Sequence, residues 1–209
     1  MARRSKEDAE ATRNKLLDAA QAVFHAKGVA GASLSDVAQA AGLTRGAIYW
    51  HFANKADLFD AMLQRVTLPF EQAWDDERAQ IEKQSFALSR ILGVFQMVLH
   101  SVSTNPITRC VFDIALYKVE CVGEMLAVRE RRLDGIKRFT SQMQGELALA
   151  AQEAQVQLPL SVESAARGLH AVFEGVLHAW LLDDAKKFDL EREGMSVVKV
   201  YLAGLGLQV

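Results

Sequence analysis

The stretch "GLTRGAIYWHF", from Gly42 to Phe52, places an arginine, a tyrosine, a tryptophan and a histidine within seven positions. Gly42 can adopt the backbone angles of a tight turn, and Thr44 is a residue type that commonly caps the first turn of a helix. The segment therefore predicts a turn followed by a short helix that ends near His51.

A second short helix is predicted directly before this turn, in residues 33–42 (SLSDVAQAAG). Ser33 and Asp36 stand three residues apart and have the pattern of a capping box, in which each side chain bonds the backbone of the other. Ala38 is small enough for two helices to cross against it, and Ile48 can hold the second helix on the first. Two short helices joined by a glycine turn predict a helix-turn-helix.

The side chains of the second helix that are not used for packing predict contact with DNA. Such a helix enters a major groove with its N-terminal end first, where Arg45 has the reach and the fork geometry to read guanine. Gly46 lets the backbone approach closely, and Trp50 meets either a thymine methyl group or a sugar. The predicted DNA contacts are Ser33, Thr44, Arg45, Gly46, Tyr49, Trp50, His51 and Lys55, of which Ser33, Tyr49, His51 and Lys55 bond phosphates.

The charge distribution favours a nucleic-acid partner, although the formal net charge of the chain is −2. Residues 1–55 contain eight basic and five acidic side chains, so this part has a net charge of +3 and the remainder one of −5. A basic N-terminal part followed by an acidic remainder is a pattern that favours DNA contact. Arg3, Arg4 and Lys6 are expected to form a loose arm that adds phosphate or minor-groove contacts.

The composition predicts an all-α fold of about nine helices. The 209 residues are 50% hydrophobic, include three prolines and are rich in residues with high helix propensity. Pro69 is expected to interrupt the fourth helix, which resumes to about Lys83. The helices are expected at about residues 10–27, 34–41, 45–51, 55–83, 86–102, 106–118, 122–154, 162–182 and 191–204.

Several classes of protein are disfavoured by the sequence. Cys110 and Cys121 form no C-x-x-C pair, which favours reduced, buried thiols in a cytoplasmic protein. The N-terminus has no apolar segment of the kind that signal peptides contain. The most apolar stretch, residues 168–182, is shorter than a membrane span and contains Glu174, so no membrane association is expected.

Three polar side chains on the apolar helix at 162–182 form the second informative group, because His170, Glu174 and His178 follow one another at intervals of four residues. An ionised glutamate in apolar surroundings is destabilising unless it is paired. Glu174 either bonds one of the histidines and orders the core, or lines a pocket and meets a cationic or hydrogen-bonding ligand. As a third alternative, the three side chains contribute to a metal site, although no further ligands are apparent.

Aliphatic and aromatic side chains at helical spacing supply further pocket candidates. Residues at this spacing are either plain core or the wall of a broad apolar pocket suited to hydrophobic molecules. The candidate ligand-binding residues are Ile91, Phe95, Val98, Phe112, Leu116, His170, Phe173, Glu174 and His178.

The segment from Gly28 to Leu63 resembles the N-terminal domain of the tetracycline-repressor (TetR) family of bacterial regulators. The family's pattern, a glycine turn followed by Tyr-x-His-Phe and then a lysine three positions on, is matched from Gly42 to Leu58. Residues 1–20 and 45–59 resemble most closely the AcrR-like branch, which represses multidrug efflux pumps. The resemblance is specific over about residues 10–65, and beyond them it rests on length and helix order.

The resemblance implies a DNA-binding domain in residues 1–55 and a ligand-binding and dimerisation domain in residues 56–209. It implies a homodimer whose last two helices pair across a two-fold axis, and a pocket for a small hydrophobic, drug-like inducer. Filling of that pocket is expected to release the operator DNA that controls an efflux operon. The resemblance implies neither a cofactor nor an enzymatic activity.

Two other functions are open from the residues alone. One is a helical small-molecule or metal sensor without a DNA role. The other is a helical enzyme that uses Glu174 and His170 as acid and base, for which the sequence offers no nucleophile–base pair or phosphate-binding glycine loop. For a repressor, we expect a ligand to move the fourth helix and thereby change the spacing of the two recognition helices, about 34 Å in a DNA-bound dimer.

Overall fold

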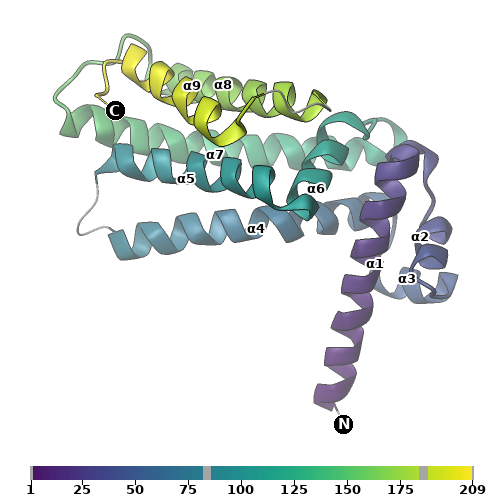
Figure 1. Cartoon of the computed structure of the whole chain (residues 1–209). Helices are drawn as coiled ribbons and strands as arrows, with labels where there is room; N and C mark the ends of the chain where they lie inside the picture. The colour runs from purple at the N-terminus through teal and green to yellow at the C-terminus, as the bar shows by residue number, and fades with distance from the viewer. Residues whose placement is uncertain (1, 82–85, 184–187, 209) are drawn as a thin grey trace. The chain divides into compact units, whose positions relative to one another are not determined.

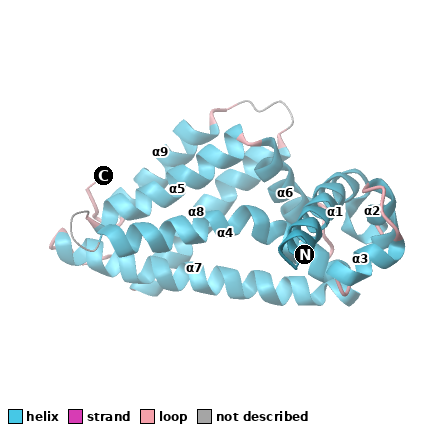
Figure 2. Ribbon diagram, turned by 90° about the horizontal axis from the view of Figure 1, so that it is seen from below, coloured by secondary structure: helices cyan, strands magenta, loops and turns pink. Residues whose placement is uncertain are grey.

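The computed structural model describes residues 2–81, 86–183 and 188–208, which form nine α-helices and one short 3₁₀ helix and contain no strand (Figures 1 and 2). This confirms the prediction of an all-α fold. Within the described part of the chain, none of the helices combines the length and the apolar character needed to cross a membrane. The elements are α1 (Ala2–Gly31), α2 (Leu34–Ala40), α3 (Arg45–His51), α4 (Lys55–Ile81), α5 (Ala87–Thr104), α6 (Pro106–Tyr117), the 3₁₀ helix η1 (Gly123–Met125), α7 (Leu126–Glu153), α8 (Val162–Leu182) and α9 (Leu190–Gly204).

The chain divides into two compact units, the first of which contains Met1–Thr67 and Cys110–Arg131. Residues from α1 to α4, the end of α6 and the start of α7 share one core, whose largest buried side chains include Phe24, Phe52 and Phe59. The ring centroids of Phe24 and Phe59 lie 6.4 Å apart. Burial of a phenylalanine contributes roughly 1.5–3 kcal/mol, so these rings stabilise the frame on which the short helices α2 and α3 rest.

α1 is longer than the sequence predicts. The helix expected over about residues 10–27 extends over Ala2–Gly31, with a local break at Gly28, where φ is 71° and ψ is 160°. The first residues are mostly good helix formers without glycine or proline, so the helix continues through them. The predicted loose arm at residues 3–6 is therefore wrong, because these residues are helical.

α4 runs without a break through Pro69, so the predicted interruption is wrong. A proline inside a helix removes one backbone hydrogen bond and crowds the preceding turn. In a helix of 27 residues this loss is local, and the turns on either side keep their own hydrogen bonds. Residues 82 and 83, at the predicted end of this helix, lie outside the described residues.

Both cysteines lie in the first unit and are free thiols. Cys110 and Cys121 are half-buried, and not buried as the sequence analysis expects. Burial raises the pKa of the Cys110 thiol above its ordinary value, against a weaker opposing effect of a hydrogen bond with Gln21. The protonated thiol is therefore the form that this environment favours.

The second compact unit contains Leu68–Arg109 and Arg132–Val209. Its core combines α5, α7, α8 and α9, and the hydroxyl of Tyr201 on α9 donates a hydrogen bond to the carbonyl oxygen of Ala165 on α8 at 3.0 Å. Each unit consists of residues that pack together, whatever their order in the chain. The first unit therefore includes part of α6 and the start of α7 together with the N-terminal helices. The functional division at residue 55 stays a prediction.

An ion pair inside the second unit gives a testable effect on stability. Arg90 and Glu146 have side chains that are 13% and 4% exposed, and the guanidinium donates to Glu146 Oε2 from Nε at 2.9 Å and from Nη2 at 2.6 Å. We expect Glu146→Ala to lower the free energy of unfolding by about 3 kcal/mol, because a buried guanidinium loses its carboxylate. Urea denaturation at fixed protein concentration measures the change. Asp134→Ala, which removes an exposed carboxylate paired with Lys137, is the control and should change stability by less than about 1 kcal/mol; equal effects of the two variants contradict the prediction.

Candidate functional site

The N-terminus of α2 is held by the capping box that the sequence predicts. The backbone N–H of Ser33 donates to Asp36 Oδ2 at 2.8 Å, and the backbone N–H of Asp36 donates to Ser33 Oγ at 3.1 Å. Lys27 Nζ donates to Asp36 Oδ1 at 2.8 Å. The bonds from Lys27 and then from Ser33 hold the pKa of Asp36 well below its usual range. The carboxylate therefore stays ionised while Lys27 balances its charge.

The turn between α2 and α3 also follows the sequence pattern. Gly42 has a φ of 64°, a conformation that glycine adopts without the strain of a Cβ atom. Thr44 Oγ1 accepts a hydrogen bond from the backbone N–H of Ala47 at 3.2 Å and caps α3. Ile48 is fully buried and packs in the core of the first unit. These contacts confirm the helix-turn-helix.

The exposed side of α3 carries the polar and aromatic groups that are predicted to meet DNA. The guanidinium carbon of Arg45 lies 5.5 Å from the centroid of the Tyr49 ring, and Trp50 is 73% exposed. The rings of Trp50 and His51 meet edge to face, with centroids 4.6 Å apart. Burial, and then the charge of Arg13, lower the pKa of His51, which favours a neutral imidazole at neutral pH. An arginine over the ring of a tyrosine, with an exposed tryptophan next in the chain, gives a surface suited to a flat, charged partner.

Lys55 and Ser33 are already engaged within the protein. The ammonium of Lys55 lies 3.0 Å from the carbonyl oxygen of Ala32 and 3.4 Å from that of Ala30. Ser33 Oγ donates to Asp36 Oδ2 at 2.6 Å. Both residues therefore order the start of α2, and their predicted phosphate contacts stay predictions, as do those of the other residues on α3.

Several of the candidate ligand-binding residues meet in the second unit. Phe95 on α5 is fully buried, and its ring centroid lies 4.7 Å from that of Phe173 on α8 and 6.0 Å from that of Phe139 on α7. Phe139 in turn lies 5.5 Å from His170. Ile91 is buried on the same helix as Phe95. The structure therefore joins Phe95, Phe173 and His170 in one aromatic cluster through Phe139 on α7, which the sequence analysis missed. Ile91 lies in the same core.

Glu174 has a partner that the sequence analysis also missed. Arg132 Nη2 on α7 donates to Glu174 Oε1 at 2.8 Å, whereas the nitrogen atoms of His170 and His178 lie 3.9 Å from the carboxylate. Of the three alternatives for Glu174, the one in which a histidine donates to it is therefore wrong, because the donor is an arginine. Contact of Glu174 with a ligand stays a prediction. Burial lowers the pKa of His170, with Arg132 acting in the same direction and Glu174 opposing. Across the described residues, no group of three His, Cys, Asp or Glu side chains is placed to hold a metal ion.

The other candidate ligand-binding residues have different surroundings. Phe112 and Leu116 on α6 belong to the first unit, where Phe112 packs against the core. Val98 on α5 is half-buried. Their predicted contact with a ligand stays a prediction. A regular apolar stripe identifies such residues as inward-facing without distinguishing core from pocket wall.

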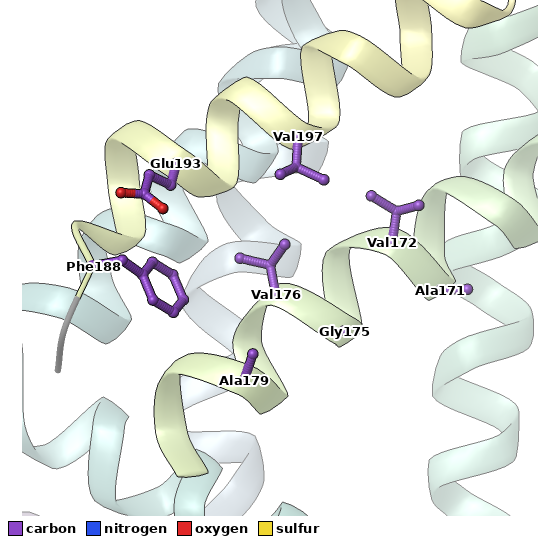
Figure 3. Close-up of a pocket in the computed structure, with 8 residues that line it drawn as sticks. All are labelled: Ala171, Val172, Gly175, Val176, Ala179, Phe188, Glu193 and Val197. Carbon is purple, nitrogen blue, oxygen red and sulfur yellow. The ribbon is translucent and has the colours of Figure 1, made fainter. Parts of the chain in front are cut away.

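A shallow apolar groove lies between α8 and the start of α9 (Figure 3). Val172 and Val176 on α8 and Val197 on α9 point toward the space between the two helices, and small residues separate them on α8. Val200, one turn beyond Val197, is 72% exposed. The lining residues are Ala171, Val172, Gly175, Val176, Ala179, Phe188, Glu193 and Val197.

Comparison with known proteins agrees with this architecture. Residues 16–62 match the family described as "Bacterial regulatory proteins, tetR family", and residues 87–206 match "MAATS-type transcriptional repressor, C-terminal region". The transcriptional regulator AcrR of Shigella flexneri is 30% identical over 202 residues, which cover 97% of this chain and 93% of that protein.

Two solved structures are similar along most of their length. NalD, the secondary repressor of the MexAB-OprM multidrug efflux pump in Pseudomonas aeruginosa, has a TM-score of 0.83 and 32% identity, with 94% of this chain and 98% of that chain covered. The complex of SmeT, a repressor from Stenotrophomonas maltophilia, with triclosan has a TM-score of 0.79 and 33% identity, with 92% and 90% covered. The chain therefore belongs to the tetR family of bacterial regulatory proteins and is a helix-turn-helix regulator of the multidrug-repressor type.

Proposed function

We propose that the protein is a dimeric, ligand-responsive repressor that binds operator DNA through α2 and α3 and leaves it when a small hydrophobic inducer binds. The genes it controls encode a multidrug efflux pump, as for NalD and SmeT. It acts in the cytoplasm, by binding alone and without catalysing a reaction. The observation that carries the proposal is the exposed side of α3, which presents Arg45, Tyr49 and Trp50 on a helix fixed by buried Ile48.

The DNA-binding role follows from the way α3 is built. Its one buried residue, Ile48, fixes it in the core that it shares with α2, and its exposed N-terminal end, with Arg45 as the first helical residue, can enter a major groove. A guanidinium at this position reads guanine O6 and N7 as a bidentate donor. Gly46 next to it carries no side chain that would hold the backbone away from the bases.

The ligand-binding role rests on the second unit. The rings of Phe95, Phe139 and Phe173 form an aromatic cluster, and the Arg132–Glu174 pair lies on the same helices, α7 and α8. Apolar surfaces with a few polar groups are typical sites for drug-like molecules. The complex of SmeT with triclosan supports a small aromatic inducer for this chain.

Dimerisation is assigned to the groove of α8 and α9. Apolar side chains such as Val176, Val197 and Val200 surround residues small enough for a partner helix to approach. Exposed apolar patches of this kind mark association sites. A second copy of the chain would place two α3 helices so that each enters one half-site of an operator.

Coupling between ligand and DNA is assigned to α4. This helix contributes residues to both compact units and is continuous from Lys55, beside the recognition helix, to Ile81. A ligand that displaces α4 changes the separation of the two recognition helices. The ligand must bind the DNA-free form more tightly, because equal affinity for both forms shifts no population.

The proposal is tested by fluorescence anisotropy of the full chain with a labelled duplex from the region upstream of its own gene and a scrambled duplex of equal length. We expect a salt-sensitive preference for the upstream duplex, and a loss of affinity when triclosan is added. Absence of any preference overturns the DNA role and favours a sensor without one. Triclosan binding, seen by calorimetry, that leaves the DNA affinity unchanged overturns the coupling.

A further inference from the structure

The first compact unit contains two kinds of basic side chain, distinguished by whether they have an acidic partner. A cation paired within the protein is less available to DNA, because its charge is already balanced at close range. Such pairs join basic residues on α1, α4 and α7, and Lys118 directly after α6, to neighbouring carboxylates. They are Lys27–Asp36, Arg65–Asp18, Lys118–Asp113 and Arg131–Asp60, with N···O distances of 2.8, 2.6, 3.5 and 2.7 Å.

Arg13 on α1 is an exposed cation at the C-terminal end of α3. Its guanidinium carbon lies 5.2 Å from the centroid of the Phe52 ring, which is buried and directly follows α3. Its charge also acts on His51, the last residue of α3. Arg13 has no acidic partner among the described residues. Stacking on a fixed ring therefore holds an unbalanced charge at a defined place.

Lys15, two residues further along α1, is an exposed cation at the opposite end of α3. Its ammonium lies 3.9 Å from the position that a Cβ atom on Gly42 would occupy, at the turn that precedes α3. No acidic side chain in the described part of the chain pairs with it. α1 therefore places one unbalanced cation beside the start of α3 and another beside its end.

This arrangement fits the dimensions of a DNA duplex. α3 has seven residues and is about 10 Å long, and the major groove is about 12 Å wide with a row of phosphates along each edge. A helix lying in the groove brings both of its ends toward these rows. We infer that Arg13 and Lys15 are phosphate-contacting residues that flank the recognition helix, an assignment that rests on the proposed DNA-binding function.

With this inference, α1 makes part of the contact with the DNA phosphates that the sequence analysis gave to Lys55, at the start of α4. Lys55 has its ammonium on the carbonyl oxygens of Ala30 and Ala32, so its position is set by the protein. Arg13 and Lys15 bear no such bonds. Phosphate contacts orient a recognition helix without reading sequence, so these two residues contribute affinity for any duplex and little discrimination between sequences.

The test is the salt dependence of DNA binding for wild type, Arg13→Gln and Lys15→Gln, on the upstream and scrambled duplexes. Each phosphate contact adds about 0.9 to the slope of log affinity against log salt, so each variant should make the slope of a dimer shallower by about 1.8. A fourfold rise in salt would then weaken wild type about twelvefold more than either variant. Affinity should fall on both duplexes alike.

Two further variants make the result specific. Arg13→Lys keeps the charge and should keep the wild-type slope. Lys137→Gln removes one exposed charge from α7 in the second unit and should leave the slope unchanged. If Arg13→Gln and Lys15→Gln both keep the wild-type salt dependence of DNA binding, with unaltered thermal unfolding, the inference is wrong while the proposed function stands. A wild-type chain that binds no duplex overturns the proposed function, and the inference with it.

Discussion

Replacing Arg45 with alanine is expected to weaken binding to the operator duplex by about thirtyfold or more. A bidentate contact from arginine to guanine contributes about 1–3 kcal/mol, and a dimer loses it at both half-sites. The side chain is exposed at the first position of α3, and alanine is a good helix former there, so the fold should be unaffected. Anisotropy titrations against the upstream and scrambled duplexes measure the change, which should be confined mainly to the upstream duplex.

Arg167→Ala is the matched control for this experiment. Arg167 is an exposed arginine on α8 that pairs with Glu163 four residues before it, far from α3 in the sequence and in the other compact unit. It should leave both affinities at the wild-type values. A loss in Arg45→Ala that is equal on both duplexes would show that Arg45 binds phosphate and does not read bases.

The second large effect is expected from Val176→Asp in the groove of α8 and α9. If this groove is the dimer interface, the substitution buries a carboxylate in an apolar surface in each of two copies. An unpaired buried charge is destabilising by several kcal/mol, so the dimer should dissociate at micromolar concentration. Sedimentation velocity should then give the mass of a single chain.

Loss of the dimer should also abolish tight operator binding, because a monomer engages one half-site. Leu160→Asp introduces the same charge at an exposed apolar residue in the loop before α8, outside the groove, and should leave the dimer intact. A Val176→Asp protein that remains dimeric, with wild-type sedimentation, would place the interface elsewhere.

Much of the helix-turn-helix is predictable from local sequence. Ser33 with Asp36, Gly42 and Thr44 act within a few residues of themselves, and the structure shows the expected caps and turn. Turns and caps are determined by short-range geometry, so a sequence pattern is enough to identify them. The bounds of α8, Val162–Leu182, agree with the prediction for the same reason.

Contacts between segments that are distant in the chain could not be predicted from the sequence. Arg132 is one of three arginines within four positions on α7, and nothing in that run indicates that it bonds Glu174, 42 residues later. Likewise, the carbonyl groups of Ala30 and Ala32 have no signature in the sequence, although they bind Lys55. Partners of this kind are set by tertiary packing, which periodicity does not encode.

The bonds from Lys55 to main-chain oxygen atoms also bear on how this protein can diverge. A carbonyl group is present whatever residue supplies it, and Ala30 and Gly31 are exposed. Substitutions in the connection between Gly28 and Ser33 therefore preserve the bonds as long as the backbone path is kept, whereas an inserted or deleted residue moves the oxygen atoms out of reach. At its exposed positions, Ala30 and Gly31, the residue type can therefore change during evolution, whereas the spacing cannot.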